Sequence, residues 1–399
     1  MTPPAPAAIT GIGCICAAGR DLSAAMSSMA SAQRSPQPPA RFGTGHPKRY
    51  PVFGVPDDFI PPDLLGRDDL LLTTRFALAA TRQAITDAGW DPGALQKLRV
   101  GVCLGTTVGS ALNIEDFYRE YRTGGSPDLE TIERFLRSNP AAAVSRELGL
   151  DGPVQTVVNA CSSGTDAIGI AASWLRAGSC DVALAGGADE LCRIIYNGFI
   201  SLMITDDRPC RPFDRERRGL NLGEGAAVLV LERTSAAASR GARARANVLG
   251  YGSACDAHHL TAPHPEGRGL RKAFAEALAT AGVAPREVAF INAHGTGTPD
   301  NDRVEGRVIH DLFPETPFVS TKGYTGHTLG AAGAIEAAFT VGCLEAGRLP
   351  ASGGFATVDP DIHATPAAAE LDIHGGIAIS DSLAFGGNNA VLVIGRADR

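Results

Sequence analysis

The sequence has no long apolar run and no excess of positive charge, and each absence excludes a class of protein. No window approaches the roughly 18 consecutive apolar residues that form a membrane span. Lys and Arg total 36 against 43 Asp and Glu, so the net charge is −7 and no general nucleic-acid surface is expected. The opening, MTPPAPAAITGIG, lacks the basic and apolar regions of a signal peptide. We therefore expect no membrane span, no nucleic-acid partner and no secretion signal.

The cysteines also lack a pattern that would predict disulfides or zinc. There are nine of them, an odd number at scattered spacing, and no two form a CxxC pair. Histidines and carboxylates likewise lack metal-ligand spacing, so no metal is expected. Reduced thiols in a cytoplasmic protein fit best, and most of these cysteines are expected to be small core residues.

A weak internal duplication organises the chain. Its 399 residues exceed the roughly 250–300 at which a single core stops growing. Similar openings occur at residues 8–13 and 246–252, and each is followed by a helix ending in Ala-Gly, a strand, and a β-branched run that leads into a small-residue helix. This order predicts an α/β protein with mixed sheets in two similar halves, residues 1–245 and 246–399, arranged about a pseudo-twofold axis. The Ala- and Gly-rich stretches at 168–172 and 329–338 are expected to lie buried between the two sheets.

Cys161 is the first candidate for chemistry. It lies in Asn159-Ala-Cys161-Ser-Ser-Gly-Thr165, between an apolar strand and a small apolar helix. A sharp strand-to-helix turn would expose its sulfur, as in nucleophile elbows. The N–H groups and dipole of the helix N-terminus are expected to lower the pKa of the thiol. A nucleophile is therefore favoured over an inert buried thiol.

Two histidines occur in equally unusual settings. His294 follows a strand in Asn-Ala-His-Gly-Thr-Gly-Thr-Pro, and His327 precedes a helix in Gly-His-Thr-Leu-Gly-Ala-Ala-Gly, five residues after Lys322. Each could be an ordinary structural histidine. Together with Cys161 they form a Cys-His-His set on separate strand ends, where active sites of α/β sheets gather.

These motifs together resemble the elongating β-ketoacyl-acyl-carrier-protein synthases of the thiolase superfamily. The resemblance covers about the whole chain, in family order, through residues 159–165, 261–266, 292–302, 320–336 and 385–390. It implies a five-layered αβαβα fold in which each half contributes a mixed β-sheet. It also implies no cofactor of the protein's own, because phosphopantetheine arrives on the carrier protein.

The resemblance implies a decarboxylative Claisen condensation. Cys161 would accept an acyl group from a carrier-protein thioester. His294 and His327 would then bind the carbonyl of malonyl-carrier protein while carbon dioxide leaves, and the resulting enolate would attack the acyl group on Cys161. Neutral imidazoles donating to an enolate oxygen are oxyanion stabilisers. Lys322 and Glu336 resemble the pair that orders the histidines.

Further residues take roles from the resemblance alone. The backbone N–H groups of Cys161 and Phe385 would form a second oxyanion hole, and Phe385 resembles the gate residue. Groups that would bind phosphopantetheine or substrate are Thr261, Thr296, Thr298, Val108 and Phe199. The gate loop departs from the family pattern, because Asn388 replaces a usual Thr and Ala384 a usual Gly.

Partners follow from the same resemblance. They are an acyl carrier protein, malonyl- and acyl-thioesters, and a second subunit in a homodimer or in a heterodimer with a related ketosynthase-like chain. Residues 67–87 hold few cations, so carrier docking is expected on the arginines Arg208, Arg211, Arg215, Arg217 and Arg218.

Four other functions compete with this one. A thiolase would need a second catalytic cysteine in a C-terminal Cys-x-Gly-x-Gly loop, where this chain has Phe385-Gly-Gly-Asn-Asn. A starter-type synthase uses Cys-His-Asn, against which His327 argues. A chain-length-factor subunit lacks the nucleophile, and a Cys-His hydrolase would need a group to orient its base. Acyl chain length and pathway stay open.

Overall fold

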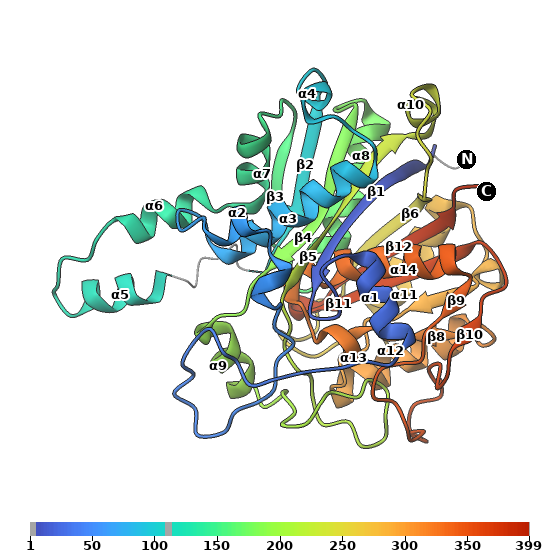
Figure 1. The fold of residues 1–399 in the computed structure, drawn as a ribbon. Coiled ribbons are helices and arrows are strands. Elements are labelled where there is room, and N and C mark those ends of the chain that lie inside the picture. Colours follow the sequence, from blue (N-terminus) through green and yellow to red (C-terminus); the bar gives the residue numbers. More distant parts are fainter. Residues whose placement is uncertain (1–4, 108–113, 399) are drawn as a thin grey trace.

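Ten hydrogen-bonded strands form the centre of the protein (Figure 1). The computed structural model describes residues 5–107 and 114–398. The strand order is β3-β2-β4-β5-β1-β6-β12-β11-β7-β8. The strands are β1 (Ala7–Cys16), β2 (Val100–Gly105), β3 (Val154–Val157), β4 (Val182–Asp189), β5 (Gly225–Arg233), β6 (Ala246–Cys255), β7 (Phe290–Asn292), β8 (Phe318–Val319), β11 (Ile377–Ala384) and β12 (Asn388–Arg396).

The two halves of this sheet repeat one pattern, which confirms the predicted duplication. In each half two parallel pairings are followed by two antiparallel ones, in the orders β3-β2-β4-β5-β1 and β8-β7-β11-β12-β6. The halves were expected as two separate sheets. The structure instead joins them where residues 7–9 of β1 pair with residues 246–248 of β6.

Helices cover the outer face of each half-sheet, and two further helices fill the space between the two half-sheets. Helix α3 (Leu72–Asp87) packs on β1, β4 and β5, and α11 (Arg268–Ala281) packs in the equivalent place on β6 and β12. Helices α8 (Ser163–Ala177) and α14 (Ala332–Ala346) contact each other and strands of both halves. These are the five layers of the αβαβα architecture. Further helices around this body include α12 (Pro299–Leu312) and α13 (Lys322–Thr325).

Glycines in the two similar openings explain why the halves look alike in sequence. A Cβ atom on Gly13 of β1 would lie 1.8 Å from the carbonyl oxygen of Ala80 in α3. A Cβ atom on Gly252 of β6 would lie 2.2 Å from the carbonyl oxygen of Ala273 in α11. Both strands need glycine because an outer helix crosses them at backbone contact.

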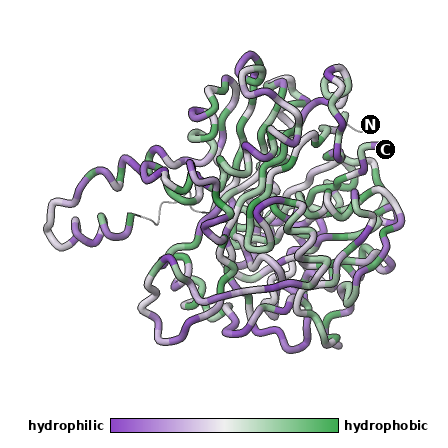
Figure 2. The backbone as a smooth tube through the Cα atoms, in the orientation of Figure 1, coloured by the Kyte–Doolittle hydropathy of each residue, from purple (hydrophilic) through white to green (hydrophobic). Residues whose placement is uncertain are grey.

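The middle layer is apolar because it is covered on all sides. Within the described ranges, one helical stretch, Leu329–Ala346, is long and apolar enough to cross a membrane, and 89% of it is buried inside the protein. Figure 2 shows hydrophobic residues along the central strands and hydrophilic residues towards the outside. The apolar stretch is therefore core of the fold.

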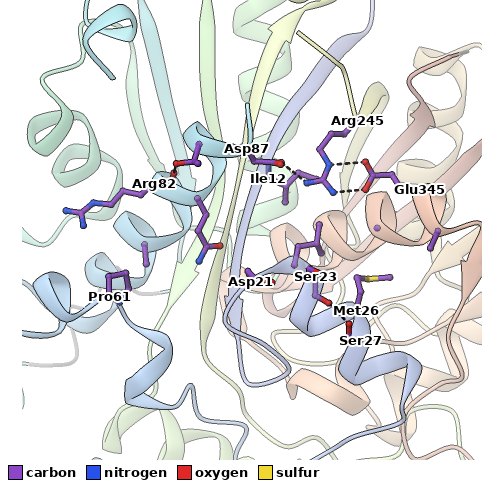
Figure 3. A pocket seen from close by; sticks show the side chains of 16 residues that line it. Ile12, Asp21, Ser23, Met26, Ser27, Pro61, Arg82, Asp87, Arg245 and Glu345 are labelled. Carbon is purple, nitrogen blue, oxygen red and sulfur yellow. Dashed lines mark hydrogen bonds and ion pairs between the residues drawn. The ribbon is translucent and has the colours of Figure 1, made fainter. Parts of the chain in front are cut away.

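A crevice of about 950 Å³ lies between α1 (Leu22–Ala30), α3 and α14 (Figure 3). At one end Arg245 bonds Asp87 of α3 (2.6 Å) and Glu345 of α14 (2.6 Å), and Arg82 bonds Asp63 (2.5 Å). Because Arg245 bonds α3 and α14 at once, this ion-pair cluster links an outer helix to the middle layer.

Two short helices project from the body as an arm (Figure 1). They are α5 (Glu115–Arg122) and α6 (Glu130–Arg137), and they expose Tyr118, Tyr121, Leu129 and Leu136 by 58–68%. Large exposed apolar side chains on a projecting segment are typical of an interface with another chain.

Candidate active site

One cavity of about 320 Å³ brings Cys161, His294 and His327 together. Its lining also contains predicted binding residues, namely Phe199, Thr261, Thr296, Thr298 and Phe385. Lys322 and Glu336 do not line the cavity and lie buried next to it, with 1% and 2% of their surface exposed. Val108 lies outside the described residues.

Cys161 lies in a strained turn between β3 and α8. The residue before it, Ala160, has φ +49°, a left-handed conformation that costs a non-glycine residue roughly 1–2 kcal/mol. Side chains hold the turn: Ser163 Oγ donates to the Ala160 carbonyl (2.6 Å), and Asn159 Nδ2 and Ser162 Oγ donate to Asp166 (2.6 and 2.8 Å). This network fixes the sulfur at the start of the helix, as expected for an elbow.

Burial reverses the expected pKa of the thiol. Desolvation raises the pKa of Cys161 to about 11, because only 4% of the residue is exposed. Lys322 and the backbone N–H groups of Phe385 and Cys161 act in the opposite direction, without overcoming burial. The expectation of a lowered thiol pKa is therefore wrong: the backbone N–H at the start of the helix acts in the expected direction, but desolvation, which the expectation left out, is larger.

His327 presents its Nε2 to the sulfur. The backbone N–H of Leu329 donates to Nδ1 of His327 (3.1 Å), which makes Nδ1 the acceptor and leaves the proton on Nε2. His327 Nε2 lies 3.1 Å from Cys161 Sγ. Leu329 itself has φ +57°, a left-handed conformation. An N–H donor at this position stabilises negative charge on the sulfur.

His294 is held by a cation instead. Lys322 Nζ lies 2.9 Å from Nδ1 of His294 and donates to the His294 carbonyl (2.6 Å). The same ammonium forms an ion pair with Glu336. Because an ammonium only donates, Nδ1 accepts and the ring carries its proton on Nε2. The lysine therefore orders one histidine by contact and the backbone orders the other.

The two rings are neutral donors of the same tautomer. Burial lowers the pKa of both His294 and His327 well below the usual range, and the charge of Lys322 lowers both further. Their centroids are 5.2 Å apart and their planes meet at 88°. A carbonyl oxygen that enters the cavity can receive two N–H bonds, which favour an enolate.

Family models match most of the chain in two parts. The β-ketoacyl synthase N-terminal domain matches residues 68–237, and the C-terminal domain matches residues 245–356. The chain belongs to the β-ketoacyl synthase family. It is thus an acyltransferase, and its recognition from the sequence motifs is confirmed.

Curated relatives agree with this family. The chain is 36% identical to 3-oxoacyl-[acyl-carrier-protein] synthase 2 of Staphylococcus aureus, over 80% of this chain and 83% of the relative. It is 33% identical to the enzyme of the same name from Synechocystis, over 96% of each chain.

Solved structures of ketosynthases have the same fold. The ishigamide ketosynthase/chain length factor superposes with a TM-score of 0.91 at 32% identity, covering 98% of this chain and 99% of that one. A type II polyketide ketosynthase in complex with its acyl-carrier protein superposes at 0.89 and 26% identity, covering 98% and 100%.

A buried acidic layer supports the loop that carries His294, and the sequence motifs did not single it out. Glu305 of α12 accepts from the backbone N–H groups of His294 (2.6 Å) and Gly295 (2.8 Å). Asp302 accepts from that of Gly297 (3.1 Å). Acidic residues three and six positions after Pro299 carry no sequence signal of their own, because the pairing depends on how α12 folds back. Among described residues, no group of three or more His, Cys, Asp or Glu is arranged to hold a metal ion.

The predicted gate residue stacks on a predicted pocket residue. The rings of Phe385 and Phe199 are 5.6 Å apart at 16°. Phe385 begins a single 3₁₀ turn in which Gly386 and Gly387 have φ +84° and +78°, and Asn388 Nδ2 donates to the Phe385 carbonyl (3.4 Å). Left-handed backbone at both positions requires the two glycines.

The predicted arginine cluster divides in the structure. Arg217 is buried and forms ion pairs with Asp359 and Asp302, so it is not available to a docking partner. Arg208, Arg215 and Arg218 are exposed, and Arg218 lines the cavity that holds Cys161. In contrast, Arg67, Arg75 and Arg82 near α3 form ion pairs with neighbouring acids.

Proposed function

We propose that this protein is a β-ketoacyl-acyl-carrier-protein synthase that condenses an acyl group on Cys161 with malonyl-carrier protein. One observation carries the proposal: a buried cysteine sulfur lies 3.1 Å from the Nε2 of one neutral histidine, with a second such histidine across the same cavity. A donor pair beside a nucleophile suits a reaction that forms an acyl-thioester and then an enolate.

The first half-reaction is acyl transfer. The Cys161 thiol gives up its proton as the sulfur attacks the carbonyl of an acyl-carrier thioester. The phosphopantetheine sulfur leaves as a thiolate with the electron pair of the broken C–S bond and takes up a proton in turn. The backbone N–H groups of Cys161 and Phe385 hold the developing oxyanion. His327 stabilises the negative charge that forms on the Cys161 sulfur.

The second half-reaction is decarboxylative condensation. His294 and His327 donate from Nε2 to the thioester carbonyl of malonyl-carrier protein. The C–C bond to the carboxylate breaks and carbon dioxide leaves. The electron pair of that bond stays on the thioester and forms the enolate. The enolate carbon then attacks the acyl carbonyl on Cys161, and the C–S bond breaks to release β-ketoacyl-carrier protein and the thiolate. Lys322 and Glu336 act as positioning residues for His294.

The phosphopantetheine chain that carries the substrates enters through the same cavity. Phosphopantetheine on the carrier protein takes the place of a resident cofactor. Thr296 Oγ1 and Thr298 Oγ1 lie 2.8 Å apart at the lining, and Thr261 lies on the same wall. These hydroxyls suit the amides of a pantetheine chain. Phe199 borders the acyl group, a role also proposed for Val108, and Phe385 gates it.

The decisive experiment uses malonyl-carrier protein and a radiolabelled acyl-carrier protein. Cys161→Ala is expected to abolish labelling of the enzyme and formation of the β-ketoacyl product. Cys161→Gln is expected to keep releasing carbon dioxide from malonyl-carrier protein, because the two histidines remain. Cys255→Ala is the matched control, since Cys255 is exposed and does not line the cavity. Condensation by Cys161→Ala at the wild-type rate would contradict the proposal.

The carrier protein docks, on this proposal, at the exposed arginines beside the cavity. Arg208, Arg215 and Arg218 are exposed and form no ion pair with a described residue, whereas the cations near α3 are already paired. Met203 and Leu260, which are 87% and 80% exposed, add apolar contacts near them. Arg218→Glu is expected to raise the KM for malonyl-carrier protein and to leave kcat unchanged. Arg286→Glu, on a remote turn, serves as the control. An unchanged KM for Arg218→Glu would exclude this surface.

A second subunit is also proposed, as a homodimer or as a related ketosynthase-like chain. The carrier complex and the ketosynthase/chain length factor structure above support both partners by likeness. Strand β3 lies at an edge of the sheet with Val154 43% exposed, and Val158 just after it is 60% exposed. Size-exclusion chromatography with light scattering is expected to show a dimer of the chain expressed alone if it is self-sufficient. A monomer that dimerises only with a co-expressed related chain indicates the heterodimer.

The proposal also includes the division of the chain into two halves and its location in the cell. Residues 1–245 form the half that carries Cys161, and residues 246–399 the half that carries His294 and His327. All nine cysteines are free thiols, which is typical of a reducing cytoplasm.

A further inference from the structure

Asp381 is a buried acid next to the loop of His294. It lies on β11 directly after Ser380, which is in register with Asn292 of β7, and it is completely buried. Within the part of the chain that the structure describes, neither carboxylate oxygen of Asp381 accepts a hydrogen bond. An ionised carboxylate in such a place would be strongly destabilising.

The acid that faces Asp381 has the opposite surroundings. Glu305 accepts from the N–H groups of His294 (2.6 Å) and Gly295 (2.8 Å), and from Nδ2 of Asn301 (2.9 Å). Three donors favour the ionised form of Glu305. A proton shared by the two carboxyls therefore resides on Asp381. The protonated Asp381 can then donate a hydrogen bond.

Among the described residues, the cations near this pair are bonded to other acids, and Lys322 acts on Asp381 only by its charge. The titratable groups that face it are Asp302 and Glu305 from α12, Lys322 from α13, Glu336 from α14, and His294. Lys322 is engaged by Glu336 and His294, and Arg217 by Asp302 and Asp359. Burial raises the pKa of both Asp381 and Glu305, and the mutual repulsion of the two carboxyls raises that of Glu305 further.

We propose that Asp381 is a positioning residue that carries the single proton of the pair, donates a hydrogen bond to Glu305, and thereby holds the His294 loop without a second negative charge. The inference rests on the proposed decarboxylation at His294. Loss of the proton would set two carboxylates against each other behind the loop. It would also place an uncompensated negative charge near a site that must stabilise an enolate.

The test compares carbon dioxide release across pH in a Cys161→Gln background, which removes the titration of the thiol. The parent is expected to lose rate on the alkaline side by about tenfold per pH unit beyond the ionisation of the pair. Asp381→Asn keeps the shape and a donor to Glu305, so its alkaline limb is expected to move to higher pH or vanish, with a neutral rate close to the parent. Glu232→Gln is the control, because Glu232 is equally buried but bonded to Arg240 in another part of the sheet. An identical alkaline limb in the parent and Asp381→Asn would overturn the proposal.

A second measurement does not need activity. Infrared spectra of wild type and Asp381→Asn, both with ¹³C-labelled aspartate carboxyls, are expected to show a protonated carboxyl at neutral pH that disappears as pH rises and is missing in the variant. The variant is needed because burial also raises the pKa of Asp302 and Asp189. Absence of a protonated aspartate band at neutral pH would overturn the proposal. If the Cys161→Gln protein releases no carbon dioxide, the proposed function fails, and the infrared result still decides the state of Asp381.

The pH dependence of folding stability tests the protonation of Asp381 independently. A raised pKa means that the folded protein binds a proton that the unfolded chain releases, so stability falls as pH rises from the usual aspartate range to the raised pKa. Asp381→Asn removes this loss. The melting temperature of the variant relative to wild type is therefore expected to increase with pH, and a constant difference would contradict the assignment.

Discussion

The two histidines of the cavity are neutral rings of the same tautomer but are held by different means. Lys322 fixes the tautomer of His294 with an ammonium group at 2.9 Å, inside a cluster of buried acids. Leu329 fixes that of His327 with a backbone N–H at 3.1 Å, which has no charge to lose. His294 should therefore respond to mutation of distant charged groups, whereas His327 should respond to the backbone at the start of the helix that follows it.

The largest expected effect comes from removing the buried ion pair of Lys322 and Glu336 while the imidazole ring of His294 stays in place. Lys322→Met leaves Glu336 as an unpaired buried carboxylate, which typically costs about 3–5 kcal/mol. Adding Glu336→Gln should restore most of the free energy of unfolding, because neither group then carries a charge. Carbon dioxide release should stay low in both variants, since Nδ1 of His294 has lost its cation. Urea denaturation and a decarboxylation assay measure the two effects, and full recovery of rate in the double variant would break the comparison.

Removing each ring tests whether the two donors are equivalent. His294→Ala and His327→Ala should each lower decarboxylation by roughly 10²–10³-fold, the usual loss for one oxyanion donor. They should differ at the sulfur, because only His327 has its Nε2 within 3.1 Å of Cys161. Alkylation of Cys161 by iodoacetamide is therefore expected to slow in His327→Ala and to change little in His294→Ala. Equal slowing in both would show that the rings do not divide the work in this way.

The smallest effect concerns the thiol that lies beside His327. Because burial raises the pKa of Cys161 to about 11, the thiolate fraction should grow about tenfold per pH unit across the neutral range. Alkylation in a Cys255→Ser background, which removes the exposed thiol, should rise with pH in the same proportion. A rate that levels off near neutral pH would mean that the helix N-terminus overcomes burial after all.

The sequence identified the elements near the site well because their signals are local. The helix ending in Ala-Gly that is expected after the second opening forms α11 over Arg268–Ala281, and the opening itself, residues 246–252, begins β6. The seam between β1 and β6 was missed, since pairing of residues 237 to 241 positions apart leaves no mark in either segment. The acids behind His294 were missed for the same reason, as Asp381 and Glu305 meet only when β11 and α12 fold against β7.

By itself the sequence determined which residues come together in the cavity, because Cys161, His294 and His327 each lie in a short motif whose glycines and small residues set the local backbone. Only the tertiary structure decided how those groups ionise. Desolvation of Cys161, the cation on His294 and the proton assigned to Asp381 depend on neighbours more than 20 residues away and on the exclusion of water, and neither can be read from a local pattern.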